Sequence, residues 1–258
     1  MTRIFEALKK SQAREAVPFQ APAPAPLHPI ATSRPGPQHA AHIEPELAPR
    51  LETATALTLP DDIVREMSAL RIGLESALEG RSARVVMFLG SVAGEGVTTV
   101  AAQFASVLAA DPALRPLLLD LNVRRPGVAA RLTPARPRAS QPPLGRPPVA
   151  RPLTVALLPE DPLAHDVPRP QGVRALLTSL AMHHDWIVVD GPPVLDAPEA
   201  ADIAEVADGV VLVVRYGHTK RPVVARAADL LRKSGARVLG SVLNRRRLEI
   251  PDFIYRRI

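Results

Sequence analysis

Residues 84–100 read RVVMFLGSVAGEGVTTV, and they indicate how the domain around them is built. The first seven residues form a continuous apolar run typical of a strand buried on both faces, and a helix is predicted from Thr98 onward. Between them, Gly94 and Gly96 let the backbone approach a ligand closely, and the N–H groups that open the helix can cradle an anion. The stretch therefore predicts a strand, a phosphate-binding loop and a helix in succession.

The remaining chain continues this alternation of apolar strands and amphipathic helices. Further strands are predicted at 115–121, 153–159, 185–190, 209–215 and 236–244, and further helices at 61–80, 172–184, 198–208 and 221–235. The helix at 61–80 begins at Asp61 or Asp62 as its cap and ends at Gly80. Strands that are apolar throughout are covered on both faces, so we predict an α/β domain with a mostly parallel sheet and helices on both sides.

Composition changes divide the chain outside that domain, and 29 of the 258 residues are proline. Residues 1–15 are predicted as a short amphipathic helix, and 16–60 as a Pro/Ala-rich disordered linker that cannot bury enough apolar surface to fold. The folded domain is placed at 61–248, with a long irregular insertion at about 122–152. Residues 249–258 form a basic aromatic tail.

Composition also narrows the class of function. The sequence has no cysteine, which excludes disulfides and Cys-ligated metal. The net charge is +6, but the arginines are scattered and aromatic residues make up 3% of the chain, so we expect no nucleic-acid partner. No apolar run approaches the roughly 18–20 residues of a membrane span, which favours a cytoplasmic protein.

Polar residues that follow the predicted strands bear on the ligand, because parallel sheets bind ligands beyond the carboxyl ends of their strands. Thr98 stands where a phosphate loop places its Mg²⁺-ligating hydroxyl, Asp120 ends the second strand, and Asp190 ends the fourth. A glycine-rich turn or a strand-ending aspartate is, on its own, as often a tight connection or a helix cap. Three such elements in this order and spacing predict a nucleotide site.

Several segments together resemble the bacterial tyrosine kinases (BY-kinases), the cytoplasmic P-loop autokinases that accompany chain-length co-polymerases in capsule and exopolysaccharide export. LLLDLNVRRP (117–126) is similar to the modified Walker A′ motif D-x-D-x-R-R-P of that family, and WIVVDGPPVLD (186–196) to its Walker B motif. MTRIFEALKK (1–10), residues 207–245 and IPDFIYRRI (250–258) also resemble family segments. This resemblance implies a P-loop ATPase fold of the ParA/MinD-like type.

The resemblance also implies ligands, roles and a partner. The ligands would be ATP and Mg²⁺, and the partner a membrane co-polymerase, with the protein peripheral at the inner membrane through that partner. The implied nucleotide contacts are Gly94, Glu95, Gly96, Val97, Thr98, Thr99 and Arg124. Thr98, Asp120 and Asp190 are the implied metal ligands, the two aspartates carry the implied catalytic roles, and Tyr255 is the candidate phosphoacceptor.

The chain departs from the family at the positions that carry charge. Val97 replaces the loop lysine, and Asn122 replaces the second acid of the A′ motif. Loss of one preorganised charge costs about 3–4 kcal/mol in the transition state, or roughly 10²–10³-fold in rate. Of the family's subunit-contact motif E-x-x-R-x-x-R only Arg71 remains, which leaves the oligomeric state open. The sequence therefore predicts a catalytically impaired, pseudokinase-like regulatory protein.

Other interpretations remain at this point. One is an active tyrosine kinase in which Arg124 or Arg125 supplies the missing charge, or in which Tyr255 is phosphorylated once a partner docks. Another is a MinD/ParA-like spatial ATPase, but Val92 stands where those proteins carry a signature lysine. The tail at 249–258 is either a contact with anionic lipid or a partner, or a solvated end.

Overall fold

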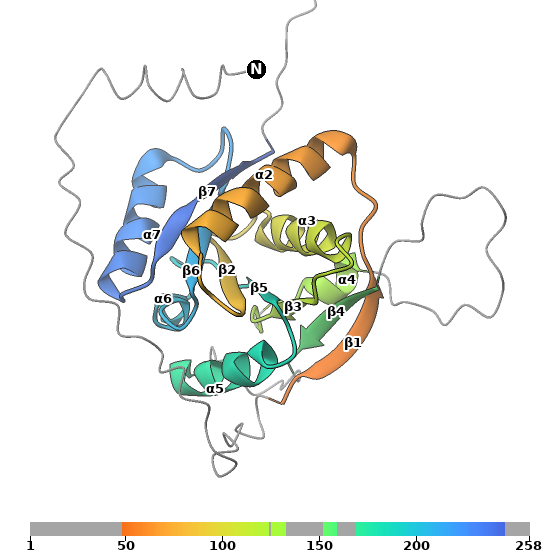
Figure 1. The fold of residues 1–258 in the computed structure, drawn as a ribbon. Coiled ribbons are helices and arrows are strands. Elements are labelled where there is room, and N and C mark those ends of the chain that lie inside the picture. Colours follow the sequence, from red (N-terminus) through yellow and green to blue (C-terminus); the bar gives the residue numbers. More distant parts are fainter. Residues whose placement is uncertain (1–47, 124, 133–151, 159–168, 246–258) are drawn as a thin grey trace, which may run out of the picture. The chain divides into compact units, whose positions relative to one another are not determined.

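The computed structural model describes residues 48–123, 125–132, 152–158 and 169–245. Figure 1 shows them as coloured ribbon. The predictions for the helix at 1–15, for the tail at 249–258 and for most of the linker and the insertion concern residues outside these ranges. No helix within the described ranges is long and apolar enough to cross a membrane.

A seven-stranded sheet forms the centre of the described domain, in the order β1-β4-β3-β5-β2-β6-β7. The strands are β1 (Arg50–Thr55), β2 (Arg84–Gly90), β3 (Pro116–Asp120), β4 (Pro152–Leu157), β5 (Trp186–Asp190), β6 (Gly209–Arg215) and β7 (Val238–Asn244). Only β1 runs antiparallel to its neighbour, and all the other pairs are parallel. The predicted mostly parallel sheet is confirmed.

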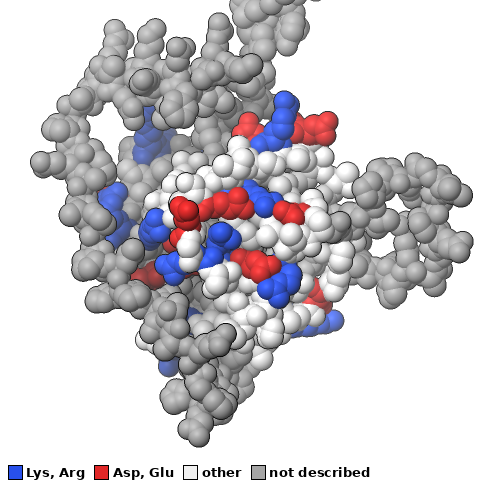
Figure 2. Space-filling view, viewed as in Figure 1, with Lys and Arg blue, Asp and Glu red and all other residues white. Residues whose placement is uncertain are grey.

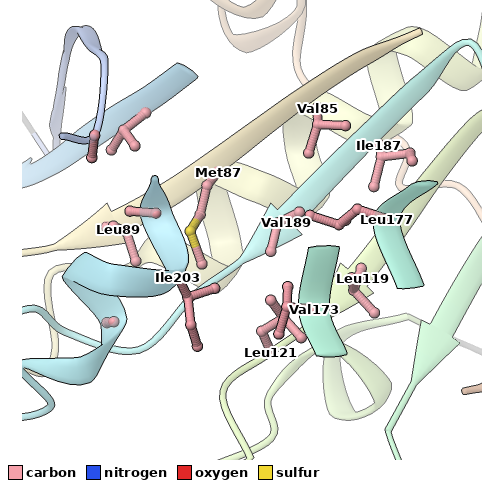
Figure 3. Close-up of a cluster of buried hydrophobic side chains, with 14 of the residues drawn as sticks. Val85, Met87, Leu89, Leu119, Leu121, Val173, Leu177, Ile187, Val189 and Ile203 are labelled. Atoms are coloured by element: carbon pink, nitrogen blue, oxygen red, sulfur yellow. The ribbon is translucent and has the colours of Figure 1, made fainter. Parts of the chain in front are cut away.

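Helices cover both faces of this sheet. They are α2 (Asp61–Ala77), α3 (Val97–Ala109), α4 (Val128–Arg131), α5 (Pro170–Ala181), α6 (Glu199–Ala204) and α7 (Arg221–Lys233). Alternate residues of each strand point to opposite faces, so Met87 and Leu89 of β2 pack in the cluster shared with α5, α6 and α7. Figure 3 shows part of that cluster. Phe88 of the same strand packs instead in the cluster shared with α2 and α3.

The strand β1 is a difference from the sequence prediction, because it lies inside the segment 16–60 that the composition indicates as linker. It pairs with β4 along six residue pairs, from Arg50 opposite Leu157 to Thr55 opposite Pro152. Most of its side chains stay at least partly exposed, with only Ala54 buried. Its stability therefore comes from the backbone ladder, which leaves little hydrophobic pattern in the sequence.

The predicted capping of α2 is wrong in detail. The helix begins at Asp61, but Pro60 is its N-cap residue and no side chain caps it. Asp61 and Asp62 lie in the first turn, where their negative charges favour the positive end of the helix dipole. Gly80 follows the helix with a φ of 81°, consistent with its predicted role as the stop.

Candidate functional site

The loops that follow β2, β3 and β5 meet at one edge of the sheet. The strand order places β5 between β3 and β2, and Asp120 at the end of β3 is paired in register with Asp190 at the end of β5. The chain passes over β5 on its way from β2 to β3, and it later passes over β2 in the opposite direction on its way from β5 to β6. Open α/β sheets bind ligands where the direction of the connections reverses in this way. The three elements predicted from the sequence lie together.

The loop between β2 and α3 contains two glycines in the left-handed region. Gly94 has a φ of 85° and Gly96 a φ of 89°, which residues with a Cβ adopt only with strain. Gly96 is the N-cap residue of α3 and has no side chain with which to cap it. Within the described residues, no side chain hydrogen-bonds to the first N–H groups of α3, which leaves them available to an anion.

Glu95 is fully buried, and its carboxylate turns back into the loop. One carboxylate oxygen accepts hydrogen bonds from the backbone N–H groups of Ser91 and, at 3.1 Å, of Val92. The other oxygen accepts a hydrogen bond of 2.5 Å from the hydroxyl of Thr219, in the loop after β6. The side chain therefore shapes the loop from inside, and a nucleotide contact at this position is left to its backbone.

The loop after β5 holds the phosphate loop from one side. The N–H of Val194 donates to the carbonyl of Gly90 at 2.9 Å, and the carboxylate of Asp196 accepts from the N–H of Ala93 at 3.0 Å. Together with Glu95, these bonds fix the first half of the loop before any ligand arrives. A loop fixed in this way needs little reorganisation to receive a phosphate.

Val97, in the position of the missing lysine, is the first residue of α3. It is half-buried and packs against the apolar cluster beneath α2 and α3. A Cβ built on Gly90 would lie 3.0 Å from its Cγ2, so the two positions are in close contact. The side chain at position 97 thus contributes to packing and carries no charge to the loop.

Thr98 lies against the loop that follows β3. A Cβ built on Gly127 would lie 3.2 Å from both the hydroxyl oxygen and the methyl carbon of Thr98. A Cβ at this distance would be tighter than an ordinary van der Waals contact, so glycine favours the close approach that brings the loop after β3 directly beside the start of α3. Thr99, the next predicted contact, is half-buried on the same turn.

Asp190 is fully buried at the end of β5. Neither carboxylate oxygen has a hydrogen-bond partner of good geometry among the described residues, although the Thr98 hydroxyl is near enough to lower its pKa. Burial above all, and then the charge of Asp120, raise the pKa of Asp190 to about 7. Burying a charged carboxylate without a hydrogen-bond partner costs free energy, and a bound cation would offset that cost. Asp190 is therefore suited to hold a cation.

Asp120 differs from Asp190, because its carboxylate is already occupied by the backbone. One oxygen accepts from the N–H of Asn122 at 3.0 Å, and the other from the N–H groups of Gly127 at 2.9 Å and Val128 at 3.1 Å. Burial raises the pKa of Asp120, and these three bonds oppose that rise. Its first role is to hold the loop after β3 and the start of α4.

The donor set fits Mg²⁺ better at Asp190 than at Asp120. Mg²⁺ prefers oxygen ligands, retains several waters and takes one or two carboxylates. Asp190 supplies a carboxylate that has no hydrogen-bond partner of good geometry in the described part of the chain, and Thr98 supplies a neighbouring hydroxyl. Asp120 would reach a cation only through lone pairs that its three backbone bonds leave unused, so the predicted metal role at Asp120 is the weaker of the two.

The described residues do not cover the whole predicted site. Arg124 and Tyr255 lie outside them. Arg71, the remaining residue of the subunit-contact motif, pairs within the chain with Glu75 at 2.8 Å and with Asp111 at 3.0 Å. Figure 2 shows acidic and basic side chains interspersed on the face that carries α2, in keeping with such local pairing.

Three residues of the site were missed in the sequence. Thr219 and Asp196 bind the phosphate loop from the loops after β6 and β5, and Asn244 binds it from the end of β7. The only signal available was position, since each residue follows or ends a predicted strand. Single polar residues at strand ends are too common for that signal to identify them.

Comparisons with known proteins identify relatives, although no family model matches the chain. Tyrosine-protein kinase YwqD of Bacillus subtilis is 26% identical over 206 residues, which cover 75% of this chain and 86% of YwqD. Succinoglycan biosynthesis transport protein ExoP of Rhizobium meliloti is 31% identical over 195 residues, which cover 68% of this chain. The chain thus spans most of YwqD but only 24% of the length of ExoP.

Solved structures support the same grouping. The kinase domain of VpsO superposes with a TM-score of 0.52 at 26% identity, covering 72% of this chain and 98% of that domain. Sheet order, glycine-rich loop and paired strand-end aspartates define the P-loop ATPase fold of the ParA/MinD-like type. Within that class, the chain belongs to the bacterial tyrosine kinase family, as the sequence resemblance predicts.

Proposed function

We propose that this protein binds ATP with Mg²⁺ but is impaired as a tyrosine kinase, and that it regulates exopolysaccharide synthesis and export as the cytoplasmic partner of a membrane chain-length co-polymerase. The observation that carries the proposal is the contrast between an intact loop and a missing charge. Gly94, Gly96 and Glu95 keep the phosphate loop in shape, whereas Val97 packs against the apolar cluster.

Nucleotide binding is supported by groups that have no other use in the described protein. The N–H groups of the first turn of α3 can donate to phosphate oxygens, and Asp190 with Thr98 would hold Mg²⁺. When bound, the ion would neutralise phosphate charge. Backbone donors and a helix dipole give affinity without a lysine, but less stabilisation of the charge that develops during phosphoryl transfer.

The cellular context is supported by the relatives. ExoP is named as a succinoglycan biosynthesis transport protein, and YwqD as a tyrosine-protein kinase. From the names of these two relatives, we extend the export context and a membrane partner to this chain. A regulatory protein of this kind would act through the conformation that it adopts with bound nucleotide, rather than through phosphoryl transfer.

The test compares nucleotide binding and phosphotyrosine formation in the same samples. The full chain, Val97→Lys and Asp190→Asn are titrated with a fluorescent ATP analogue with and without Mg²⁺, and phosphotyrosine is followed by mass spectrometry. We expect Mg²⁺-dependent binding by the wild type that Asp190→Asn weakens, and no phosphotyrosine. Val97→Lys should tighten ATP binding, while the same change at exposed Val64 on α2 should not.

Two results would contradict parts of this proposal. Robust autophosphorylation of the wild type that is lost in Asp190→Asn would show an active kinase. Turnover only after addition of the cytoplasmic segment of a co-polymerase would show a partner-dependent enzyme. Failure of that segment to co-purify with the full chain would remove the proposed partner while leaving nucleotide binding intact.

A further inference from the structure

The short helix α4 is fixed beside the candidate metal position. Its first residue, Val128, and the preceding Gly127 donate their N–H groups to the carboxylate of Asp120, at 3.1 and 2.9 Å. Gly127 also lies against Thr98, whose hydroxyl group would hold Mg²⁺. The helix therefore has a defined place on the side of the phosphate loop where both aspartates lie.

Arg131 is the last residue of α4, and its side chain is exposed. Within the described residues, it makes no ion pair or side-chain hydrogen bond. Burial is the main influence on the pKa of Asp190 and raises it, but the positive charge of Arg131 is near enough to lower it. An arginine thus stands near the buried carboxylate, at the end of a fixed helix, and no acid among the described residues pairs with it.

The position of this charge relative to the sheet decides what it can contact. Asp120 and Asp190 lie at the ends of β3 and β5, on one side of β2, whereas β6 and β7 lie on the other. Asp190 and Thr98 would hold the Mg²⁺ that accompanies the outer phosphates of a nucleotide, so the terminal phosphate would lie on the β5 side. Lys220, the N-cap residue of α7, follows β6 and lies on the opposite side.

We propose that Arg131 contacts the terminal phosphate of a bound nucleoside triphosphate and supplies there a positive charge that Val97 does not. This inference rests on the proposed nucleotide binding and adds a residue that distinguishes ATP from ADP. A guanidinium suits this role, because its planar set of donors matches phosphate oxygens and its charge persists at all physiological pH. A diphosphate lacks the group that Arg131 would contact.

The experiment measures the affinity of the full chain for fluorescent ATP and ADP analogues in the presence of Mg²⁺. Arg131→Ala should weaken ATP binding by roughly tenfold or more, as expected for loss of a charged hydrogen bond, and ADP binding by less than about twofold. Arg131→Lys should retain a large part of the ATP affinity. Lys220→Ala, at the same edge of the sheet, should not change the ratio of the two affinities.

Each other outcome has a distinct meaning. Unchanged ATP affinity in Arg131→Ala would show a solvated helix end and overturn the inference alone, as would equal losses for ATP and ADP. Selective loss of ATP affinity in Lys220→Ala would assign the charge to the β6 side instead. Absence of nucleotide binding by the wild type would overturn both this inference and the proposed function. Because Arg131 is exposed, its variants should retain the wild-type unfolding midpoint.

Discussion

The side-chain amide of Asn244 donates a hydrogen bond of 2.8 Å to the backbone carbonyl of Glu95. This bond joins the last strand of the sheet to the phosphate loop across 149 residues of sequence. A Cβ at position 96 would collide with the same nitrogen, so the glycine there makes the contact possible. The loop is thus enclosed by the strand β7 as well as by its own neighbours.

Gly96→Ala should be more damaging than Gly94→Ala, although both glycines have a positive φ. The left-handed conformation alone costs a residue with a Cβ about 1–2 kcal/mol, and this is the full effect expected at Gly94, which has open space around it. At Gly96 the new methyl group also collides with Asn244. The free energy of unfolding in urea measures both losses.

The Asn244→Ala background provides the control for that comparison. Removal of the amide should relieve the collision and bring the cost of Gly96→Ala close to that of Gly94→Ala. Equal costs of the two glycine substitutions in the wild-type background would show that Asn244 moves aside freely.

Thr219→Val should loosen the phosphate loop, whereas Thr219→Ser should not. Valine removes the hydroxyl that donates to Glu95 and leaves one oxygen of a buried carboxylate without that bond. A hydrogen bond to a charged group contributes about 1.5–3 kcal/mol, and we expect a loss of stability in that range. Faster hydrogen exchange at the N–H groups of Ser91 and Val92 would locate the change, and its absence would contradict a coupling through Glu95.

Asp120→Asn should release the segment around α4. The amide side chain has one acceptor oxygen in place of two, so it cannot serve Asn122, Gly127 and Val128 together. We expect a loss of about 1–3 kcal/mol and increased hydrogen exchange at Val128. Unchanged exchange there would show that the carboxylate is not what holds the helix.

Asp190→Asn should stabilise the metal-free protein at alkaline pH. The pKa of Asp190 is raised by burial to about 7, so the folded state binds its proton more tightly than the unfolded state. The free energy of unfolding therefore falls as pH rises from about 4 to about 7, and then levels off. The asparagine variant escapes this loss of about 4 kcal/mol, so the two proteins should differ at pH 8 and converge near pH 4.

Asp185→Asn provides a control of opposite sign, measured in EDTA by the same urea titrations. A hydrogen bond from Arg115 holds the pKa of Asp185 below its usual value, so its contribution is present at neutral pH and is lost in acid. Asp185→Asn should thus be destabilising at pH 8. A stability difference between wild type and Asp190→Asn that does not change with pH would contradict the raised pKa.

The sequence was sufficient for the parallel core of the domain and for the convergence of Thr98, Asp120 and Asp190. Apolar strands such as 185–190 carry a strong signal because both of their faces are buried, and parallel topology then brings their ends to one edge. The strand β1 could not be predicted in this way, since an edge strand held by backbone bonds leaves most of its side chains exposed.

The sequence predicted where the site residues lie better than it predicted what their side chains do. Glu95 and Asp120 are acids in a nucleotide motif, which suggests ligand contacts, but the structure directs both carboxylates to backbone N–H groups. Those partners depend on side-chain rotation and on loops distant in sequence. Arg131 had no motif to distinguish it from the other arginines until α4 was placed beside Asp120.

The internal carboxylate of Glu95 has a consequence for how such loops are inherited. Because the loop is braced from within and enclosed by Asn244, Gly96 and Glu95 contribute to the fold itself, whether or not ATP is turned over. Position 97 has no such duty to the fold beyond filling apolar space. A change at position 97 alone would therefore remove the charge of the loop and still leave its glycine-rich signature in place, so that signature is a record of architecture rather than of activity.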